Sequence, residues 1–196
     1  LLPASVSAGA SPVDVSLLRE GDIIFHESVS RQCRAVKLAT RSRYTHAGII
    51  FKYDGRFMVL EAVQPVKITP LESFIGRGVD GHFVIKRLKN RDEIIDAGAV
   101  GKMKRLGATW LGKNYDLYFE WDDRRFYCTE LIWKLYKRAA GVEVGKLRKL
   151  REFDLSHPHV KKLMAERYGA RVPLDEPVIS PQGMFEADNL TTVLER

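Results

Sequence analysis

The sequence lacks several features that mark large protein classes. It contains only two cysteines, Cys33 and Cys128, too few for a disulfide framework and without the number or spacing of a structural zinc site. No stretch approaches the roughly 20 consecutive apolar residues that span a bilayer. The chain also carries no RNA-recognition signature, no zinc-finger spacing, no internal repeat and no low-complexity segment. We therefore expect a globular protein with no metal, no cofactor and no nucleic-acid partner.

The composition provides enough apolar residues for a core and an excess of positive charge. Hydrophobic residue types make up 45% of the chain, so disorder is not expected. The net charge is +7, and lysine and arginine concentrate in residues 134–151 and 161–171. Such a field favours acidic partners, including an anionic membrane surface or cell-wall polymer. Because acidic residues are interleaved with these bases, solvated helical faces explain the same pattern.

The first 17 residues differ from the rest of the chain. They begin with LLPASVSAGASPVD, which alternates small, apolar and polar residues before any periodic pattern starts. Two interpretations stay open for residues 1–17: the remnant of a secretory signal, with an A-x-A-like processing site in SVSAGA, or a disordered leader. We expect residues 18–196 to form a single domain.

The predicted elements indicate an α+β fold. Apolar residues 23–25 predict a strand, residues 30–40 a short helix, and residues 81–89 another strand. The near-helical spacing of apolar residues from Ile94 to Trp110 predicts one helix, and a further helix runs from Cys128 to a stop at Gly141. The order strand, helix, antiparallel strands, helix, helix is typical of an α+β protein rather than a doubly wound parallel sheet.

A hairpin centred on Asp54-Gly55 allows a geometric test. If these two residues form the loop, Tyr53 pairs with Arg56, and the alternation of side chains puts His46 and Glu61 on the same face. The two residues are then diagonal neighbours, roughly 7–8 Å apart at the backbone. Glu61 lies in an apolar strand and needs a partner if it is buried. A three-residue loop would move Glu61 to the other face, so the prediction depends on the turn.

Cys128 starts a predicted amphipathic helix. The positive end of a helix dipole favours the thiolate, and a nearby imidazolium would favour it further. The first-turn Cys128 N–H is free to stabilise an oxyanion. Simple packing is the alternative for this cysteine, and small-core packing is our prediction for Cys33. A zinc site made of His46, Glu61 and Cys128 is a further alternative, although no fourth ligand is evident.

Several segments together resemble a known family. They include GDIIFHES (residues 21–28), YTHAGIIF (44–51), LEAVQPVKITPL (60–71) and RRFYCTELIWKLY (124–136). These resemble the YiiX-like proteins, which are circularly permuted NlpC-type cysteine hydrolases with a papain-like fold. The order histidine, glutamate, cysteine is similar to that of the permuted family. The resemblance implies a small antiparallel sheet or barrel packed against helices.

The resemblance also implies roles for individual residues. Cys128 matches the nucleophile, His46 the base and Glu61 the orienting residue. LGKNYD (residues 111–116) is similar to the family's Gly-x-x-Tyr segment, so Tyr115 would line the site and help bind the carbonyl or oxyanion. Thr129 stands where relatives commonly carry serine. The family's typical activity on amide bonds of peptidoglycan stem peptides implies a peptide or amino-acyl amide substrate. A processed leader would imply export, and resemblance to YiiX-like proteins of Gram-negative bacteria implies a periplasmic location.

Acidic residues cluster just ahead of the nucleophile. We expect one of them, with Asp116 and Asp122 as candidates, to bind a substrate amine, unless the cluster is only a solvated loop. The sequence thus predicts a cysteine amidase or peptidase with a Cys-His-Glu triad. Two alternatives remain: a thiol-dependent lipid acyltransferase or phospholipase-like enzyme, and a non-catalytic module that binds cell wall or lipid.

Overall fold

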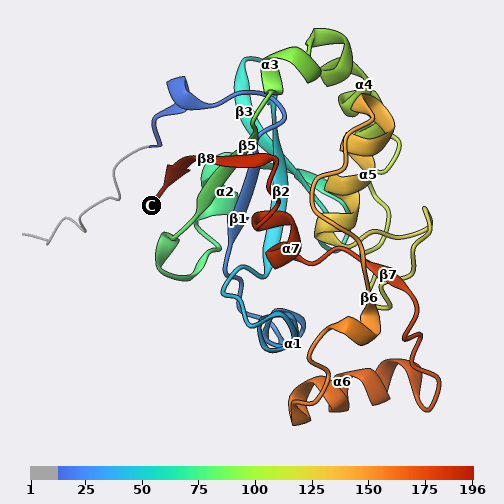
Figure 1. The fold of residues 1–196 in the computed structure, drawn as a ribbon. Helices are drawn as coiled ribbons and strands as arrows, with labels where there is room; N and C mark the ends of the chain where they lie inside the picture. The colour runs from blue at the N-terminus through green and yellow to red at the C-terminus, as the bar shows by residue number, and fades with distance from the viewer. Residues whose placement is uncertain (1–12) are drawn as a thin grey trace, which may run out of the picture.

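The structure, a computed structural model, describes residues 13–196 and is built around a six-stranded sheet (Figure 1). Its strands follow the order β4-β3-β2-β1-β5-β8, and every neighbouring pair is antiparallel. The strands are β1 (Ile23–His26), β2 (His46–Tyr53), β3 (Arg56–Glu61), β4 (Lys67–Pro70), β5 (Val84–Leu88) and β8 (Leu190–Glu195). Since β4 and β8 lie at opposite edges, this is an open sheet and not a closed barrel.

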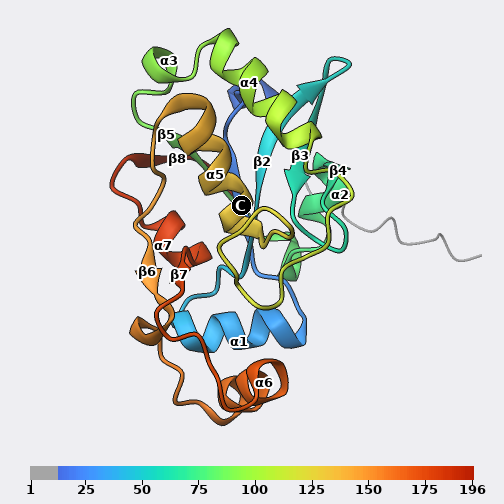
Figure 2. The ribbon, with the colours of Figure 1, turned by 90° about the vertical axis from the view of Figure 1, so that its right-hand side faces the viewer.

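Helices and a small second sheet surround these strands (Figures 1 and 2). The α-helices are α1 (Arg31–Thr40), α2 (Leu71–Ile75), α3 (Arg91–Ile94), α4 (Ala97–Ala108), α5 (Cys128–Ala140), α6 (Pro158–Tyr168) and α7 (Pro181–Phe185). Short 3-10 turns are η1 (Val15–Leu17), η2 (Val79–Gly81) and η3 (Leu150–Glu152). The second sheet pairs β6 (Arg148–Lys149) with β7 (Pro177–Val178). No helix in residues 13–196 is long and apolar enough to cross a membrane.

The two faces of the main sheet are covered by different elements. Side chains alternate along β1, so Ile23 and Phe25 join the larger core with α5, whereas Ile24 joins the smaller core with Phe74 of α2. The same alternation in β2 sends Ala47, Ile49 and Phe51 toward the larger core. His46 and Ile50 therefore share the face covered by α2, with Gly48 between them.

The predicted hairpin register is confirmed. Tyr53 pairs with Arg56, and Ile49 pairs with Leu60, as a two-residue loop requires. Asp54 and Gly55 both have positive φ, at 49° and 77°, which is the backbone of the tight turn that an Asp-Gly pair favours. The register therefore puts His46 and Glu61 on the same face of the sheet.

Gly48 allows α2 to pack directly against β2 and β3. A Cβ atom at this position would lie 2.2 Å from Val59 Cγ1 and 3.1 Å from Phe74 Cε2. The bare backbone at Gly48 leaves room for the Phe74 ring, which stacks on His46 at 5.5 Å between ring centroids. This packing fixes the histidine ring from the α2 side.

Three predictions at the element level need correction or stay open. The prediction of one continuous helix over Ile94–Trp110 is wrong. Asp96 is the N-cap of α4, and its side chain accepts a hydrogen bond from Ala99 N at 2.7 Å. The proline-marked tail contains β7 and α7, and it leads to β8, which the sequence did not indicate. Of the predicted leader, residues 1–12 lie outside the described residues, and Val15–Leu17 form η1.

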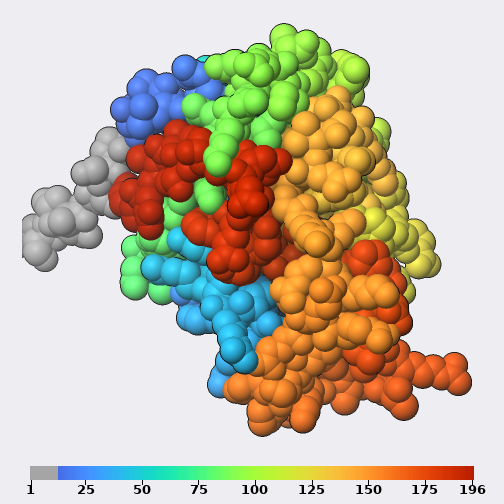
Figure 3. Space-filling model, viewed as in Figure 1, coloured from blue at the N-terminus to red at the C-terminus, as the bar shows by residue number. Residues whose placement is uncertain are grey.

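Segments far apart in the sequence meet at the end of the sheet. In both ribbon views α1 and α6 lie side by side, and Arg31 of α1 pairs with Glu166 of α6 at 2.5 Å (Figures 1 and 2). Asp154 N donates to Ala39 O at 3.1 Å. On the surface, the red C-terminal segment meets light-blue N-terminal residues and the orange segment that contains α6 (Figure 3).

Candidate active site

Cys128 is the first residue of α5 and is 2% exposed. Its two sequence neighbours tie the start of the helix to the C-terminal segment. Thr129 Oγ1 donates to Ile179 O at 2.6 Å, and Ile179 N donates to the Tyr127 hydroxyl at 3.1 Å. These two bonds, on either side of Cys128, fix the position of its thiol.

His46 and Glu61 form a buried pair on the α2 face. His46 Nε2 lies 2.7 Å from Glu61 Oε2. The other carboxylate oxygen, Oε1, accepts from Thr69 Oγ1 at 2.6 Å and from Arg77 Nη2 at 2.5 Å. Glu61 is completely buried, and its charge is met by three donors. With its oxygens so engaged, the carboxylate holds the imidazole in one orientation.

His46 stands between the carboxylate and the thiol. Because Nε2 faces Glu61, the opposite ring nitrogen is the one left for Cys128, and the thiol and the imidazole shift each other's pKa. His46 is the first residue of β2, so its ring lies at the end of the sheet, where α5 begins. The three groups therefore stand in series, Cys128, His46, Glu61.

The electrostatics of these three groups favour a thiolate on Cys128 and an imidazolium on His46. Burial raises the pKa of the Cys128 thiol, but the hydrogen bond and charge of His46, aided by the Ala47 and Thr129 backbone, lower it overall. Burial by itself lowers the pKa of His46. The interactions with Cys128 and Glu61 are stronger than this effect and raise the pKa to about 9. For Glu61, burial opposes ionisation, and the His46, Thr69 and Arg77 interactions bring its pKa to about 2.

A second histidine, His26, pairs with His46 across β1 and β2. Its ring stacks on Phe74 at 4.4 Å and lies 5.3 Å from the His46 ring. Burial, followed by the charges of His46 and Arg77, lowers the pKa of His26 to about 3. His26 is therefore neutral at physiological pH and places no second charge beside the imidazolium of His46.

Tyr115 and the Cys128 backbone N–H were the residues predicted to face an oxyanion, and the structure places both at one pocket. Tyr115 lines the same pocket as Cys128. Its backbone is held by Gln64 Oε1, which accepts from Tyr115 N at 2.7 Å, and by a bridge to Phe126. Burial raises the pKa of the Tyr115 phenol, so it keeps its proton. The Cys128 N–H occupies the first helical position, where no intrahelical carbonyl can accept from it.

An apolar pocket of about 70 Å³ opens beside Cys128. Its walls come from α1, the start of α5, α6 and the segment around β7, and the loop before α5 adds Tyr115 and Phe119. Typical apolar members of the lining are Ala35, Val36, Leu163, Met164, Val178 and Ile179. Such a lining suits an apolar ligand group.

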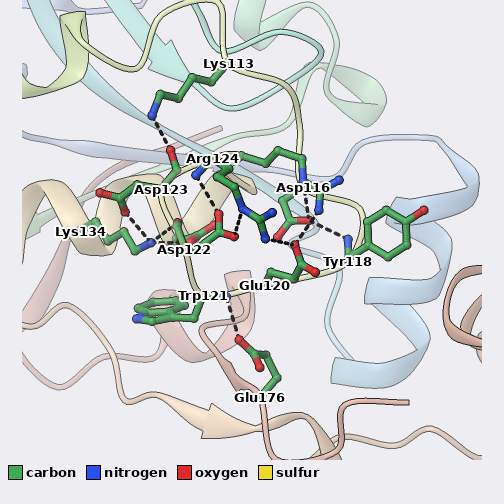
Figure 4. Close-up of polar contacts among 12 residues, drawn as sticks. Lys113, Asp116, Tyr118, Glu120, Trp121, Asp122, Asp123, Arg124, Lys134 and Glu176 are labelled. Carbon is green, nitrogen blue, oxygen red and sulfur yellow. Dashed lines mark hydrogen bonds and ion pairs between the residues drawn. The ribbon is translucent and has the colours of Figure 1, made fainter. Parts of the chain in front are cut away.

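The acidic residues before Cys128 do not line this pocket. Asp122 accepts from Arg124 N and Nε at 2.7 and 2.6 Å, and Asp116 Oδ1 accepts from Tyr118 N at 2.8 Å (Figure 4). Asp116 is fully buried, and burial raises its pKa. The predicted role of Asp116 and Asp122 in binding a substrate amine therefore has no support in their placement, because neither side chain reaches the pocket.

Lys134 links the acidic loop to α5, the helix that begins at Cys128. Its ammonium donates to Glu130 Oε1 at 2.7 Å, Asp123 Oδ1 at 3.0 Å and Asp122 O at 2.5 Å. It is 3% exposed and lies 4.9 Å from the centroid of the Trp121 ring. Glu130 Oε2 in turn accepts from Tyr127 N at 3.2 Å. Lys134 and Glu130 thus join the loop to the backbone immediately before Cys128.

The alternative of a zinc site does not fit this geometry. The imidazole lies between the thiol and the carboxylate, so the three groups do not converge on one point. Within residues 13–196, no group of three or more histidine, cysteine, aspartate or glutamate side chains is arranged to hold a metal ion.

The structure brings together Cys128, His46, Glu61 and Tyr115, as the sequence predicted, and adds residues that the sequence did not reveal. Arg77 and Thr69 complete the environment of Glu61, and His26 packs beside His46. The sequence did indicate that Glu61, if buried, needs hydrogen-bond donors besides one histidine. It did not indicate that Arg77, in a glycine-rich loop after α2, is one of them.

Comparisons with known proteins find one matching family model, a similar sequence and a similar structure. A family model described as "Permuted papain-like amidase enzyme, YaeF/YiiX, C92 family" matches residues 17–194. The uncharacterized protein YiiX of Escherichia coli (strain K12) is 44% identical over 173 residues, 88% of this chain and 84% of that protein. The crystal structure of metalloprotein yiiX from Escherichia coli O157:H7 matches with a TM-score of 0.84 and 43% identity, covering 91% of this chain and 97% of that chain.

Proposed function

Because the chain belongs to the YaeF/YiiX family of permuted papain-like amidases, we propose that it hydrolyses an amide bond through a thioester on Cys128. Family membership and the matching structure establish the permuted papain-like fold. The observation that carries the proposed mechanism is the buried series Cys128, His46, Glu61, with 2.7 Å between His46 Nε2 and Glu61 Oε2. Nucleophile, base and orienting acid occupy the positions that covalent catalysis requires.

The first half of the reaction forms the thioester. The Cys128 thiolate attacks the carbonyl carbon, and the oxygen takes up negative charge facing the Cys128 N–H and the Tyr115 phenol. When the intermediate collapses, the C–N bond breaks and the His46 imidazolium gives its proton to the departing amine. Glu61, held by Thr69 and Arg77, keeps the imidazole in place throughout.

The second half hydrolyses the thioester. Neutral His46 takes a proton from water, the resulting hydroxide attacks the thioester carbonyl, and the C–S bond breaks. The products are a carboxylic acid and the Cys128 thiolate, which pairs again with the imidazolium. No redox change occurs, and the protons balance over the two steps.

The pocket favours an apolar group on the acyl side of the substrate. Its lining is largely aliphatic and aromatic, whereas peptidoglycan stem peptides carry several charges. The substrate we propose is therefore an amide with an apolar acyl or side-chain group, and stem peptides take second place.

The same apolar lining supports a second candidate function, cleavage or transfer of lipid acyl groups by the same thiol. A comparison of amide and ester forms of one acyl group distinguishes these two functions.

The test is replacement of the nucleophile. Cys128→Ala should lower kcat/KM on an acyl amide by more than about 1,000-fold, because the covalent route is lost. The melting temperature should change by no more than about 2 °C, since one small side chain is removed. Cys33→Ala is the matched control and should keep its activity. Full activity in Cys128→Ala would refute the mechanism, as would failure to trap a thioester by intact-mass spectrometry at low pH in an active wild type.

A further inference from the structure

Two polar side chains in the apolar pocket have no partner in the described part of the chain. Arg167 makes no hydrogen bond, ion pair or ring contact, although its neighbour Glu166 is paired with Arg31. The Gln32 side-chain oxygen, Oε1, is buried and accepts no hydrogen bond. Both residues line the pocket that contains Cys128. The buried Gln32 oxygen is costly to leave without a donor, whereas the half-buried Arg167 guanidinium is open to water and to a ligand in the pocket.

The two side chains come from helices that are fastened together. Arg31 and Glu166 form an ion pair between α1 and α6, and His159 Nε2 lies 3.1 Å from Arg31 O. Gln32 directly follows Arg31, and Arg167 directly follows Glu166. Gln32 and Arg167 are therefore the sequence neighbours of the two residues that form this ion pair. Because Arg31 already neutralises Glu166, no acid of the described chain is paired with Arg167.

The chemistry of these groups specifies what they would bind. A guanidinium presents a planar fork of donors that matches a carboxylate, and it stays charged at physiological pH. An amide oxygen needs an N–H donor. An acylated amino acid supplies both groups on neighbouring atoms, beside an acyl chain that suits the apolar lining. We infer that Arg167 and Gln32 form a recognition site for the free carboxylate and the amide N–H of an N-acyl amino acid.

This inference rests on the proposed amidase function, and it specifies the charge of the substrate. Among the residues that line the pocket, Arg167 is the permanently charged side chain, and the acids expected to bind an amine are engaged elsewhere. A phosphate would also suit the guanidinium, but a fully ionised phosphate has no donor for the Gln32 oxygen, whereas the amide N–H is a donor at every pH. The carboxylate of an acylated amino acid meets both requirements.

The experiment measures binding, so that it does not depend on turnover. The full chain with Cys128→Ala is titrated with N-octanoylglycine and with N-octanoylglycinamide, which share the acyl chain and the N–H but differ in charge. The acid should bind about tenfold more tightly than the carboxamide, as expected for one charge-assisted contact. Adding Arg167→Met should remove this preference and leave the affinity for the carboxamide within about twofold.

Three further variants control the result. Arg171→Met removes the same charge from an exposed position outside the pocket, so the preference should persist. Gln32→Met should weaken both ligands equally, because both carry the N–H. Arg167→Lys keeps the positive charge but lacks the planar donors of the guanidinium, so it should retain part of the preference for the acid. This variant can be used if Arg167→Met does not fold.

Specific outcomes would overturn the inference. Equal affinity for acid and carboxamide, or a preference that survives Arg167→Met, excludes carboxylate recognition by Arg167. Tighter binding of octyl phosphate than of N-octanoylglycine would assign the site to phosphate instead. Turnover is measured separately as glycine released by the wild-type chain. If the acid is preferred but no glycine is released, the recognition site is supported and hydrolysis of this bond is contradicted. If glycine is released but the acid is not preferred, hydrolysis is supported and the recognition site is contradicted.

Discussion

At the scale of single residues, the environment of Cys128 determines its reactivity. Burial alone would leave the thiol protonated and inert, as it does for Cys33, whose pKa is raised chiefly by burial. The difference at Cys128 comes from His46, whose own pKa rises to about 9 because Glu61 and the thiol stabilise its charged form. Two free cysteines in one small protein thus have opposite shifts.

This contrast predicts a selective reaction with alkylating agents. The pKa of Cys128 is lowered, so a larger fraction is thiolate at pH 6, whereas the raised pKa of Cys33 leaves it a thiol there. Iodoacetamide at pH 6 should modify Cys128 at least about tenfold faster than Cys33, since the thiolate is the nucleophile. Peptide mass spectrometry over a time course gives both rates. His46→Ala should abolish the difference. Equal, slow rates in the wild type would show that the thiol is not activated.

At the scale of elements, α5 and the loop before it form one unit. Lys134 joins Glu130 in the helix to Asp122 and Asp123 in the loop, and Lys113 Nζ donates to Asp123 O from the other end (Figure 4). The loop also carries Tyr115. A disturbance at Lys134 therefore reaches both the thiol and the proposed oxyanion donor.

Removal of Lys134 tests this coupling. Lys134→Met should lower the free energy of unfolding by about 3 kcal/mol, because the buried Glu130 carboxyl and the loop oxygens of Asp122 and Asp123 all lose their donor. Glu130 is poised to take up a proton, since burial raises its pKa to about 8, with Lys134 opposing the shift. Lys134→Met combined with Glu130→Gln should therefore recover part of the loss. Urea unfolding measures stability, and amide exchange over residues 115–126 measures loosening of the loop.

The control for Lys134 is another cation on the same acid. Arg138 pairs with Asp123 at 2.5 Å but is 41% exposed, so Arg138→Met should cost less than about 1 kcal/mol. If the two single variants lose the same stability, the buried position of Lys134 has no special importance. If amide exchange in the loop is unchanged in Lys134→Met, the loop is held by its other contacts.

At the scale of the whole molecule, the pocket beside Cys128 exists only because distant segments meet. α1 comes from the first quarter of the chain, α6 and β7 from the last, and neither adds a strand to the main sheet. They gather at the end of the sheet where His46 starts β2 (Figures 1 and 2). The proposed catalytic groups belong to the sheet and α5, whereas the pocket walls, which we propose select the substrate, belong mainly to α1, α6 and the tail.

A substitution that fills the pocket should therefore separate substrate selection from chemistry. Ala39 is a pocket residue of α1. Ala39→Phe should lower kcat/KM for an octanoyl amide by about tenfold or more, while an acetyl amide of the same amine keeps its rate, because only the longer chain needs the volume. Ala165→Phe, on the exposed face of α6 outside the pocket, is the matched control. Equal losses for both chain lengths would show that the acyl group binds elsewhere.

The sequence by itself determined the local geometry of the catalytic strands and helix. Asp54-Gly55 set the two-residue turn, the turn set the register, and the strict alternation of a strand put His46 and Glu61 on one face. The apolar stripe and Gly141 defined α5, whose first residue is Cys128. These features depend on neighbours within a few residues, so local rules suffice to predict them.

Only the tertiary structure decided what lies around those groups. Arg77 reaches Glu61, Ile179 bonds the residues on either side of Cys128, and β8 completes the sheet edge, all through contacts between distant segments. The acids near Cys128 in sequence turn to Arg124, Tyr118 and Lys134, whereas Arg167, some 40 residues later, enters the pocket. Proximity in sequence is no guide here, because side-chain partners are chosen by packing and charge in the folded chain.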